Sequence, residues 1–139
     1  MTYYLSLGAN IGNREQTIRL ALQLIEQRAG VILRCSDFYY SKPWGFESQH
    51  DFCNLCCAVQ TDLLPLKMLA VTQTIERKLG RTHKSRNGIY SDRTIDIDLI
   101  RAFDDHGAEI SSEGSPLLTL PHPLWQQREF VTKPLSQIL

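Results

Sequence analysis

Two aspartates spaced two residues apart are the clearest candidates for chemistry in this chain. They lie within residues 93–100, RTIDIDLI, a segment typical of a β-strand. Because side chains alternate along a strand, Asp96 and Asp98 share one face and the apolar residues take the other. Two neighbouring carboxylates repel each other, and a divalent cation such as Mg²⁺, which prefers oxygen ligands, relieves that repulsion. The spacing therefore predicts a magnesium site, although two incidental acids on a solvent-facing strand would give the same pattern.

Basic side chains crowd the approach to this pair in a chain that is otherwise neutral, with 15 Lys and Arg against 15 Asp and Glu. They are Arg77, Lys78, Arg81, His83, Lys84, Arg86 and Arg93. A solvated loop is the usual explanation for such a run. Its place beside the acidic pair favours a site for Mg²⁺ and bound phosphate oxygens, which arginine binds bidentately. Since the chain has neither a phosphate loop nor a dinucleotide fingerprint, ATP would have to bind through side chains and metal.

A second cluster combines aromatic rings with an amide. Phe52 and Asn54 lie two residues apart on one expected strand, and Phe130 is a further candidate ring. Rings that sandwich a planar heterocycle, with an amide that binds its edge, would form a pterin or base pocket. Taken alone, phenylalanines in such segments are more often core residues.

Hydrophobic periodicity predicts the elements that position these residues. We expect strands over 3–7, 31–40, 52–61 and 93–103, a helix from Asn13 to Gly30, a second helix from Pro65 to Gly80 and a short helix near Pro123. The second helix has an apolar stripe of Leu64, Met68, Val71, Ile75 and Leu79. The β-α-β-β-α-β order is the ferredoxin-like pattern. It predicts an α+β fold, a mostly antiparallel sheet with helices packed on it, in a single domain of residues 1–139. Residues 81–92 lack periodicity and are expected to form a loop, residues 104–107 a turn, and residues 117–120 a segment that pairs nearby.

Composition limits the remaining possibilities. Hydrophobic residues make up 42% and charged residues 22% of the chain, as in globular proteins. No apolar stretch is long enough to span a membrane, and the N-terminus lacks a signal-like pattern, so a cytoplasmic location is expected. The C-x-x-C spacing of Cys53 and Cys56 suggests zinc, but the only thiol outside this segment, Cys35, is distant. Reduced, buried cysteines are therefore the preferred interpretation.

At this point the sequence resembles one known family, 6-hydroxymethyl-7,8-dihydropterin pyrophosphokinase, along nearly the whole chain. The matching stretches are residues 5–10 (LSLGAN), 52–54 (FCN), 73–76 (QTIE), 80–81 (GR), 92–98 (DRTIDID), 120–123 (LPHP) and 128–130 (REF). The run RTIDID followed by Pro-His is highly specific in this order.

The resemblance implies transfer of pyrophosphate from ATP to the hydroxymethyl group of the dihydropterin, with release of AMP, in folate biosynthesis. It implies that Asp96 and Asp98 hold two Mg²⁺ ions and act in catalysis with Arg81 and Arg93, which clamp the phosphates. The residues implied at the ATP site are Gln73, Glu76, Arg81, Arg93, His122 and Arg128. Those implied at the pterin site are Ser41, Trp44, Phe52, Asn54 and Phe130. Asp96 is the candidate that orients or accepts the hydroxyl proton, and closure of the 81–92 loop would exclude water.

Some residues depart from the family pattern. Tyr90-Ser91-Asp92 stands where members often have Trp-Gly-Pro, in a loop that looks longer than usual. Leu117 stands where some members carry an arginine, and Phe52 where tyrosine is common. These changes bear on loop behaviour and ATP affinity rather than on the class of reaction.

Two other interpretations use the same scaffold. A noncatalytic nucleic-acid-binding module would explain the basic loop but not the aspartates beside it, which repel phosphate without a metal. Another phosphotransferase or phosphatase is a second alternative, weakened because no covalent nucleophile motif is present. The expected partners are therefore the small molecules ATP and dihydropterin, with neither nucleic acid nor membrane, and the expected state is a monomer.

Overall fold

An antiparallel sheet of five strands forms the centre of the fold, in a computed structural model that describes residues 1–42, 51–80, 94–112 and 117–139. The elements are β1 (Thr2–Ala9), α1 (Arg14–Arg28), β2 (Val31–Cys35), β3 (Tyr39–Ser41), β4 (Phe52–Gln60), α2 (Pro65–Lys78), β5 (Asp96–Phe103), the 3₁₀ turn η1 (Trp125–Gln127) and α3 (Glu129–Ser136). The strand order is β2-β4-β1-β5, β3 pairs with β4, and every pairing is antiparallel. This is the ferredoxin-like arrangement, so the predicted α+β fold class is confirmed.

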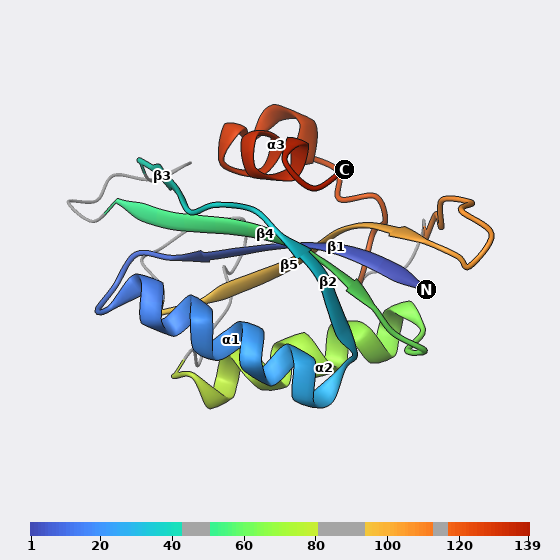
Figure 1. The fold of residues 1–139 in the computed structure, drawn as a ribbon, viewed down its shortest axis with the longest axis horizontal. Helices are drawn as coiled ribbons and strands as arrows, with labels where there is room; N and C mark the ends of the chain where they lie inside the picture. The colour runs from blue at the N-terminus through green and yellow to red at the C-terminus, as the bar shows by residue number, and fades with distance from the viewer. Residues whose placement is uncertain (43–50, 81–93, 113–116) are drawn as a thin grey trace.

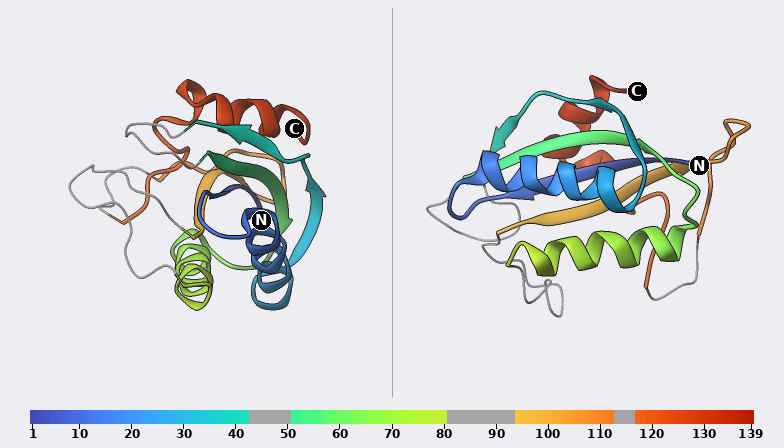
Figure 2. Two further views of the ribbon diagram at one scale, coloured as in Figure 1. Left: turned by 90° about the vertical axis from the view of Figure 1, so that its left-hand side faces the viewer. Right: turned by 60° about the horizontal axis from the view of Figure 1, so that its bottom comes forward.

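Side-chain alternation gives the sheet two different faces. Leu7, Leu55 and Ile97 are buried on one face, in a cluster that includes apolar residues of α1 and α2. Cys56 and Ile100 are buried on the other face, against apolar residues of α3. Figure 1 shows α1 and α2 below the sheet and α3 above it, and the turned views of Figure 2 show the same layers. We call these the two-helix face and the α3 face.

The helix ends follow the signals in the sequence. The side chain of Asn13 accepts a hydrogen bond of 3.2 Å from the backbone N–H of Gln16 and so caps α1, as predicted. Pro65 occupies the first turn of α2, where its missing N–H costs nothing. Gly80 ends that helix with φ of +102°, a conformation that glycine adopts without strain. Leu64 is 66% exposed, so its assignment to the buried stripe of α2 was wrong.

The predicted continuous strand over 31–40 is divided into β2 and β3. Between them, the backbone N–H of Ser36 donates to the carbonyl oxygen of Cys56 at 2.8 Å, and the Ser36 hydroxyl accepts from the N–H of Cys56 at 2.9 Å. The serine side chain therefore takes over one bond of the sheet ladder and lets the chain turn while both pieces pair with β4.

Other predicted boundaries also differ from those observed. In the described part of the predicted strand 93–103, β5 begins only at Asp96. Within segment 117–120, Leu120 forms an isolated bridge with Ser112. The helix expected near Pro123 consists of η1 followed by α3.

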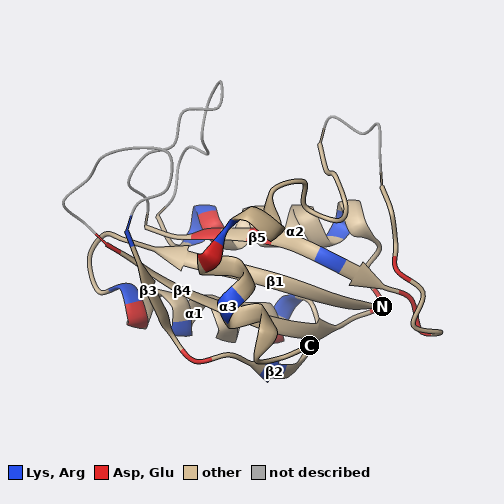
Figure 3. Cartoon of the chain, turned by 90° about the horizontal axis from the view of Figure 1, so that it is seen from above, with Lys and Arg blue, Asp and Glu red and all other residues tan. Residues whose placement is uncertain are grey.

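Charged residues of both signs are spread along the described chain. Figure 3, which views the chain from the side of α3, shows blue basic and red acidic residues on several helices and strands. A helix that could cross a membrane does not occur in the described segments, since none is long and apolar enough.

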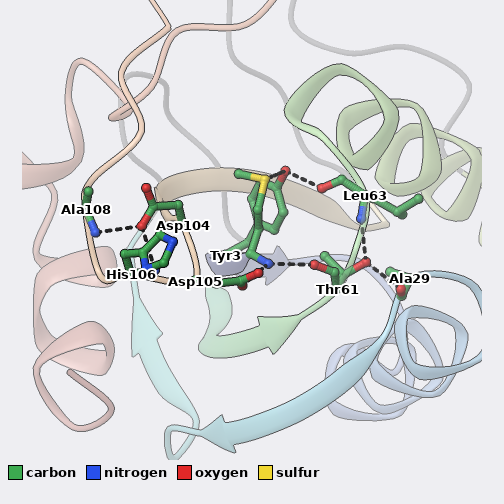
Figure 4. Close-up of polar contacts among 9 residues, drawn as sticks. Tyr3, Ala29, Thr61, Leu63, Asp104, Asp105, His106 and Ala108 are labelled. Atoms are coloured by element: carbon green, nitrogen blue, oxygen red, sulfur yellow. Dashed lines mark hydrogen bonds and ion pairs between the residues drawn. The ribbon is translucent and has the colours of Figure 1, made fainter.

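A buried tyrosine anchors the end of the sheet where β1 starts. The hydroxyl of Tyr3 donates a hydrogen bond of 2.7 Å to the carbonyl oxygen of Leu63, just before α2. The N–H of Leu63 donates to the Thr61 hydroxyl at 3.1 Å, which donates to the carbonyl of Ala29 at 2.6 Å (Figure 4). This chain of bonds joins β1, the end of β4 and the end of α1. Burial raises the pKa of Tyr3 to about 12.

The turn predicted after β5 is confirmed in the same region. One carboxylate oxygen of Asp104 accepts hydrogen bonds of 2.9 Å from the backbone N–H groups of His106 and Ala108 (Figure 4). These two bonds stabilise the reversal of the chain at Gly107, and they hold the pKa of the Asp104 carboxyl below its usual value.

Removal of the Tyr3 hydroxyl is expected to destabilise the protein. In Tyr3→Phe the carbonyl of Leu63 loses its buried donor, and the free energy of unfolding should fall by about 1–2 kcal/mol in urea denaturation. Tyr40→Phe is the matched control, because Tyr40 is 53% exposed and its hydroxyl donates to Glu15 at the surface. An equal loss in both variants would show that the bond to Leu63 has no special part in stability.

Candidate active site

Two rows of paired residues run across the sheet from β4 through β1 to β5. In one row Asn54 pairs with Gly8 and Gly8 with Asp96, and in the next Cys56 pairs with Ser6 and Ser6 with Asp98. Residues opposite each other in an antiparallel pair project from the same face. The aspartates and Asn54 therefore lie on the α3 face, with only the small residues Gly8 and Ser6 between them on β1.

The two aspartates have the alternation that the sequence predicted. Asp96 and Asp98 are half-buried, whereas Ile97 and Leu99 are buried in the cluster of the two-helix face. The rise of a strand places Asp96 and Asp98 roughly 7 Å apart, and two strand spacings place Asp96 about 10 Å from Asn54. The carboxylate pair and the amide thus occupy opposite sides of one site of small-molecule size.

Asn54 is held in one orientation by its neighbours on β3. Its amide nitrogen donates to the carbonyl oxygen of Tyr39 at 3.1 Å and to the hydroxyl of Ser41 at 2.8 Å, and the residue is only 3% exposed. Because both amide hydrogens are used, the amide oxygen is left as the acceptor for a ligand. That oxygen lies over Gly8, where a Cβ atom would approach it to 3.0 Å.

The aromatic residues lie on the same face. Phe52 is half-buried, precedes Asn54 by two residues on β4 and pairs with Ser41 of β3. Phe130 is half-buried on α3 and packs against the apolar cluster of the α3 face. The guanidinium carbon of Arg128 lies 5.7 Å from the centre of the Phe130 ring, and Arg128 is almost fully buried. The structure thus brings Ser41, Phe52 and Asn54 together and sets Phe130 on the helix that covers the same face.

Two described residues expected around ATP, His122 and Glu76, bond to the backbone of β5. The backbone N–H of His122 donates to the carbonyl oxygen of Ile100 at 2.8 Å, two residues from Asp98. Its ring Nδ1 accepts from the N–H of Leu124 at 3.1 Å, so the neutral ring carries its proton on Nε2 and can donate from there. Gln73 and Glu76 lie one turn apart on α2, and the buried Glu76 contacts the backbone of β5.

Three predicted site residues, Trp44, Arg81 and Arg93, lie outside the described residues. The described ends of the 81–93 segment nevertheless come close together, since a Cβ atom on Gly80 would lie 4.0 Å from the Thr94 hydroxyl. Arg81 directly follows Gly80 in sequence, and Arg93 directly precedes Thr94.

The cysteines of β4 do not converge. Cys56 faces α3, where its thiol donates to the carbonyl oxygen of Val131 at 3.7 Å, whereas Cys57 is buried on the two-helix face. Cys53, three residues before Cys56, also lies on the two-helix face, so the C-x-x-C spacing does not assemble a site here. In the described parts of the chain no group of three or more His, Cys, Asp or Glu residues could hold a metal ion.

Sequence reasoning missed the part that β1 plays in the site. Residues 5–10 entered the predictions only as part of the family resemblance, with no role assigned to Gly8, yet Gly8 lies between Asn54 and Asp96. A glycine inside a strand often marks a place that another group approaches closely, and this signal could have identified it. Ser6, which is buried between Cys56 and Asp98, offered no comparable signal.

The chain belongs to the 7,8-dihydro-6-hydroxymethylpterin-pyrophosphokinase (HPPK) family, whose model matches residues 4–139. The predicted family and the predicted pyrophosphokinase class are confirmed, in preference to a nucleic-acid-binding module or another phosphotransferase.

Individual relatives agree with this assignment. The 2-amino-4-hydroxy-6-hydroxymethyldihydropteridine pyrophosphokinase of Porphyromonas gingivalis is 47% identical over 135 residues, 97% of this chain and 88% of the relative. The enzyme of the same name from Bacillus subtilis is 38% identical, over 97% of this chain and 76% of the relative. A crystal structure of an HPPK-DHPS protein in complex with substrates matches with a TM-score of 0.70 and 16% identity, over 99% of this chain and 40% of that one. This last likeness concerns the fold alone.

The burial of the β4 thiols predicts their reactivity. Burial raises the pKa of Cys53 to about 11 and that of Cys56 to about 12, whereas Cys35 is exposed. At about pH 8 a disulfide reagent should modify Cys35 first. The β4 thiols should react roughly 100-fold more slowly, because little of their thiolate form is present and access to them is blocked. Cys35→Ser should abolish the fast phase. A second fast thiol in that variant would contradict the burial of Cys53, Cys56 and Cys57.

Proposed function

We propose that this chain transfers the terminal pyrophosphoryl group of ATP to the hydroxymethyl group of 6-hydroxymethyl-7,8-dihydropterin and releases AMP, in folate biosynthesis. The observation that carries the proposal is the cross-sheet row Asn54, Gly8, Asp96. It sets a ring-binding amide and a carboxylate about 10 Å apart on one face, with no side chain between them. The names of the relatives point to the same substrate.

The pterin would occupy the β4 side of the row. A pterin is flat and has N–H donors along one edge, and the amide oxygen of Asn54 is the acceptor that suits them. Phe52 and Phe130 would stack on its two faces, as aromatic side chains do with planar rings. Ser41 would act by fixing the amide through its 2.8 Å hydrogen bond. Trp44 stays a prediction from the resemblance.

The phosphates of ATP would occupy the β5 side. Asp96 and Asp98 fit Mg²⁺, because they offer oxygen donors from one face of one strand, and their partners on β1 are Gly8, which has no side chain, and the small residue Ser6. When bound, two Mg²⁺ ions, the number that the resemblance implies, would neutralise charge on the phosphate oxygens. His122 would donate from Nε2 to a phosphate oxygen, and Gln73 and Arg128 would border the nucleotide. Glu76, which the resemblance also implies at this site, bonds to the backbone of β5 beside it.

In the proposed reaction the pterin hydroxyl oxygen forms a bond to the β-phosphorus of ATP. The bond between that phosphorus and the oxygen bridging to the α-phosphate breaks, and AMP leaves with that oxygen. Asp96 is the carboxylate nearer the pterin side, opposite Gly8, and we assign to it the orientation or acceptance of the hydroxyl proton. Arg81 and Arg93 would stabilise charge on the transferred group. Closure of the segment that joins them would exclude water.

Four further assignments belong to the same proposal. The chain acts as a single domain, as a monomer and in the cytoplasm, on ATP and dihydropterin rather than on nucleic acid or membrane. The length and composition of the chain support the single domain and the location. Size-exclusion chromatography with light scattering tests the monomer.

The reaction is tested by the ratio of AMP to ADP. With ATP, Mg²⁺ and the dihydropterin, the protein should form AMP and pyrophosphorylated pterin in equal amounts, and Asp96→Asn or Asp98→Asn should reduce the rate about 100-fold or more. Asp62→Asn is the control, since Asp62 is exposed ahead of α2 and lies outside the proposed site. Formation of ADP would reject pyrophosphoryl transfer, and full activity in both site variants would reject the carboxylate pair.

The pterin pocket is tested by Ser41→Ala. Loss of the hydroxyl frees one amide hydrogen of Asn54, and the affinity for the dihydropterin should fall about tenfold in calorimetric titration, as expected for one lost hydrogen bond in the supporting shell. Ser136→Ala on α3 is the control, because the Ser136 hydroxyl is exposed and bonds only within its helix, to the carbonyl of Lys133. Unchanged affinity in Ser41→Ala would show that the orientation of Asn54 by Ser41 does not contribute to pterin binding.

A further inference from the structure

β5 is an edge strand, and several of its outward backbone groups form single hydrogen bonds with residues outside the sheet. It ends the strand order β2-β4-β1-β5, so one side of its backbone has no strand partner in the described chain. On that side the carbonyl of Ile100 accepts from the N–H of His122, and the carbonyl of Ala102 accepts from the N–H of Ile110, both at 2.8 Å. The N–H of Ile97 donates at 2.8 Å to a carboxylate oxygen of Glu76. Of these three bonds, only the one at Ile97 uses a side chain.

This bond falls between the two aspartates. Successive residues of an antiparallel strand direct their backbone groups to alternate sides. Since the N–H of Ile97 points outward to Glu76, the backbone groups of Asp96 and Asp98 point inward to β1. The peptide that joins Asp96 to Ile97 is therefore held from both sides, by β1 and by Glu76.

The position needs such an anchor. Asp96 is the first residue of β5, and the ends of edge strands open more readily than the interior of a sheet. Thr72 and Ile75 of α2 are fully buried, so the helix that carries Glu76 is fixed to the core. Glu76 itself is 2% exposed, and burying a carboxylate is costly unless it is bonded. An apolar residue would pack at this point of α2 at lower cost, but it would leave the N–H of Ile97 without its acceptor.

We infer that Glu76 is a positioning residue, which fixes the start of β5 so that Asp96 and Asp98 present their carboxylates together to a divalent cation. Glu76 reaches the edge of β5 from the two-helix layer, whereas the aspartates project from the α3 face. It therefore acts through the backbone of Ile97. This inference rests on the proposed function only where it concerns the cation.

The test uses three variants and two measurements. Glu76→Gln keeps an acceptor oxygen for Ile97, Glu76→Ala removes it, and Glu76→Met removes it while it fills most of the space, in case the alanine variant unfolds. Glu26→Gln and Glu26→Ala are matched controls on the exposed side of α1. The first measurement is amide hydrogen exchange at Ile97 in the metal-free protein. The second is the Mg²⁺ concentration that half-saturates binding of a non-hydrolysable ATP analogue, with dihydropterin affinity measured alongside.

The expected result separates the variants by their acceptor. In Glu76→Ala or Glu76→Met the Ile97 amide should exchange about tenfold faster or more, and the half-saturating Mg²⁺ concentration should rise about tenfold, with pterin affinity within about twofold of wild type. In Glu76→Gln the exchange rate at Ile97 and the half-saturating Mg²⁺ concentration should both stay within about threefold of wild type. Equal impairment in Glu76→Gln and Glu76→Ala, or unchanged exchange at Ile97 in Glu76→Ala, would overturn the inference.

Failure of the proposed function would look different. If the ATP analogue bound the wild-type protein without Mg²⁺, and Asp96→Asn changed nothing, the assignment of a metal to the aspartates would be wrong. Exchange at Ile97 would still decide whether Glu76 holds the strand. A loss of pterin affinity equal to the loss of Mg²⁺ dependence in Glu76→Ala would indicate a general disturbance of the fold and would also overturn the positioning role.

Discussion

The pairing of β1 with two strands at once is the constraint on which the site depends. β4 carries Asn54 and β5 carries Asp96, and β1 lies between these strands. In the two rows that hold the polar residues, β1 contributes Gly8 and Ser6. Because side chains alternate with a period of two, a slip of one residue in either pairing would move an entire set of side chains to the other face. The apolar residues of β1, which are buried on the two-helix face, oppose such a slip. The same core that stabilises the sheet thus fixes which chemical groups share the α3 face.

α3 divides that face into two parts. Its buried residues Val131 and Leu135 cover Cys56 and Ile100, and this apolar cluster gives the helix a reason to pack there. The two cross-sheet rows also carry Asp96, Asp98 and Asn54, and these three residues lie outside the apolar cluster. A helix that covered the whole face would also bury the aspartates, and burying charged carboxylates costs several kcal/mol. Partial coverage of the face by α3 suits the proposed ligand site, and the same helix carries Phe130.

Much of this arrangement was predictable because it is local. The alternation around Asp96 and Asp98, the cap at Asn13 and the stop at Gly80 depend on neighbours in sequence, and the structure has all of them. The division of segment 31–40 was not predictable, because the Ser36 hydroxyl bonds to Cys56, which lies twenty positions away. The place of Gly8 in the site and the bond between Glu76 and Ile97 were not predictable for the same reason, although the resemblance implied Glu76 at the ATP site. Their partners, Asn54 and Ile97, come close only after the sheet and the helix layer have formed.

The carboxylates at the start of β5 are difficult to explain by stability alone. Two charges roughly 7 Å apart repel each other by about 0.6 kcal/mol in water and about 2.4 kcal/mol at the effective dielectric of a protein surface. Asp96 and Asp98 are half-buried, so their repulsion lies between these limits, and the buried carboxylate of Glu76 at the edge of the same strand adds to it. On the α3 face a bound divalent cation, as proposed, would offset the repulsion between Asp96 and Asp98. Glu76 instead accepts the N–H of Ile97 at the edge of β5, so the third acid supports the strand backbone and points away from the other two.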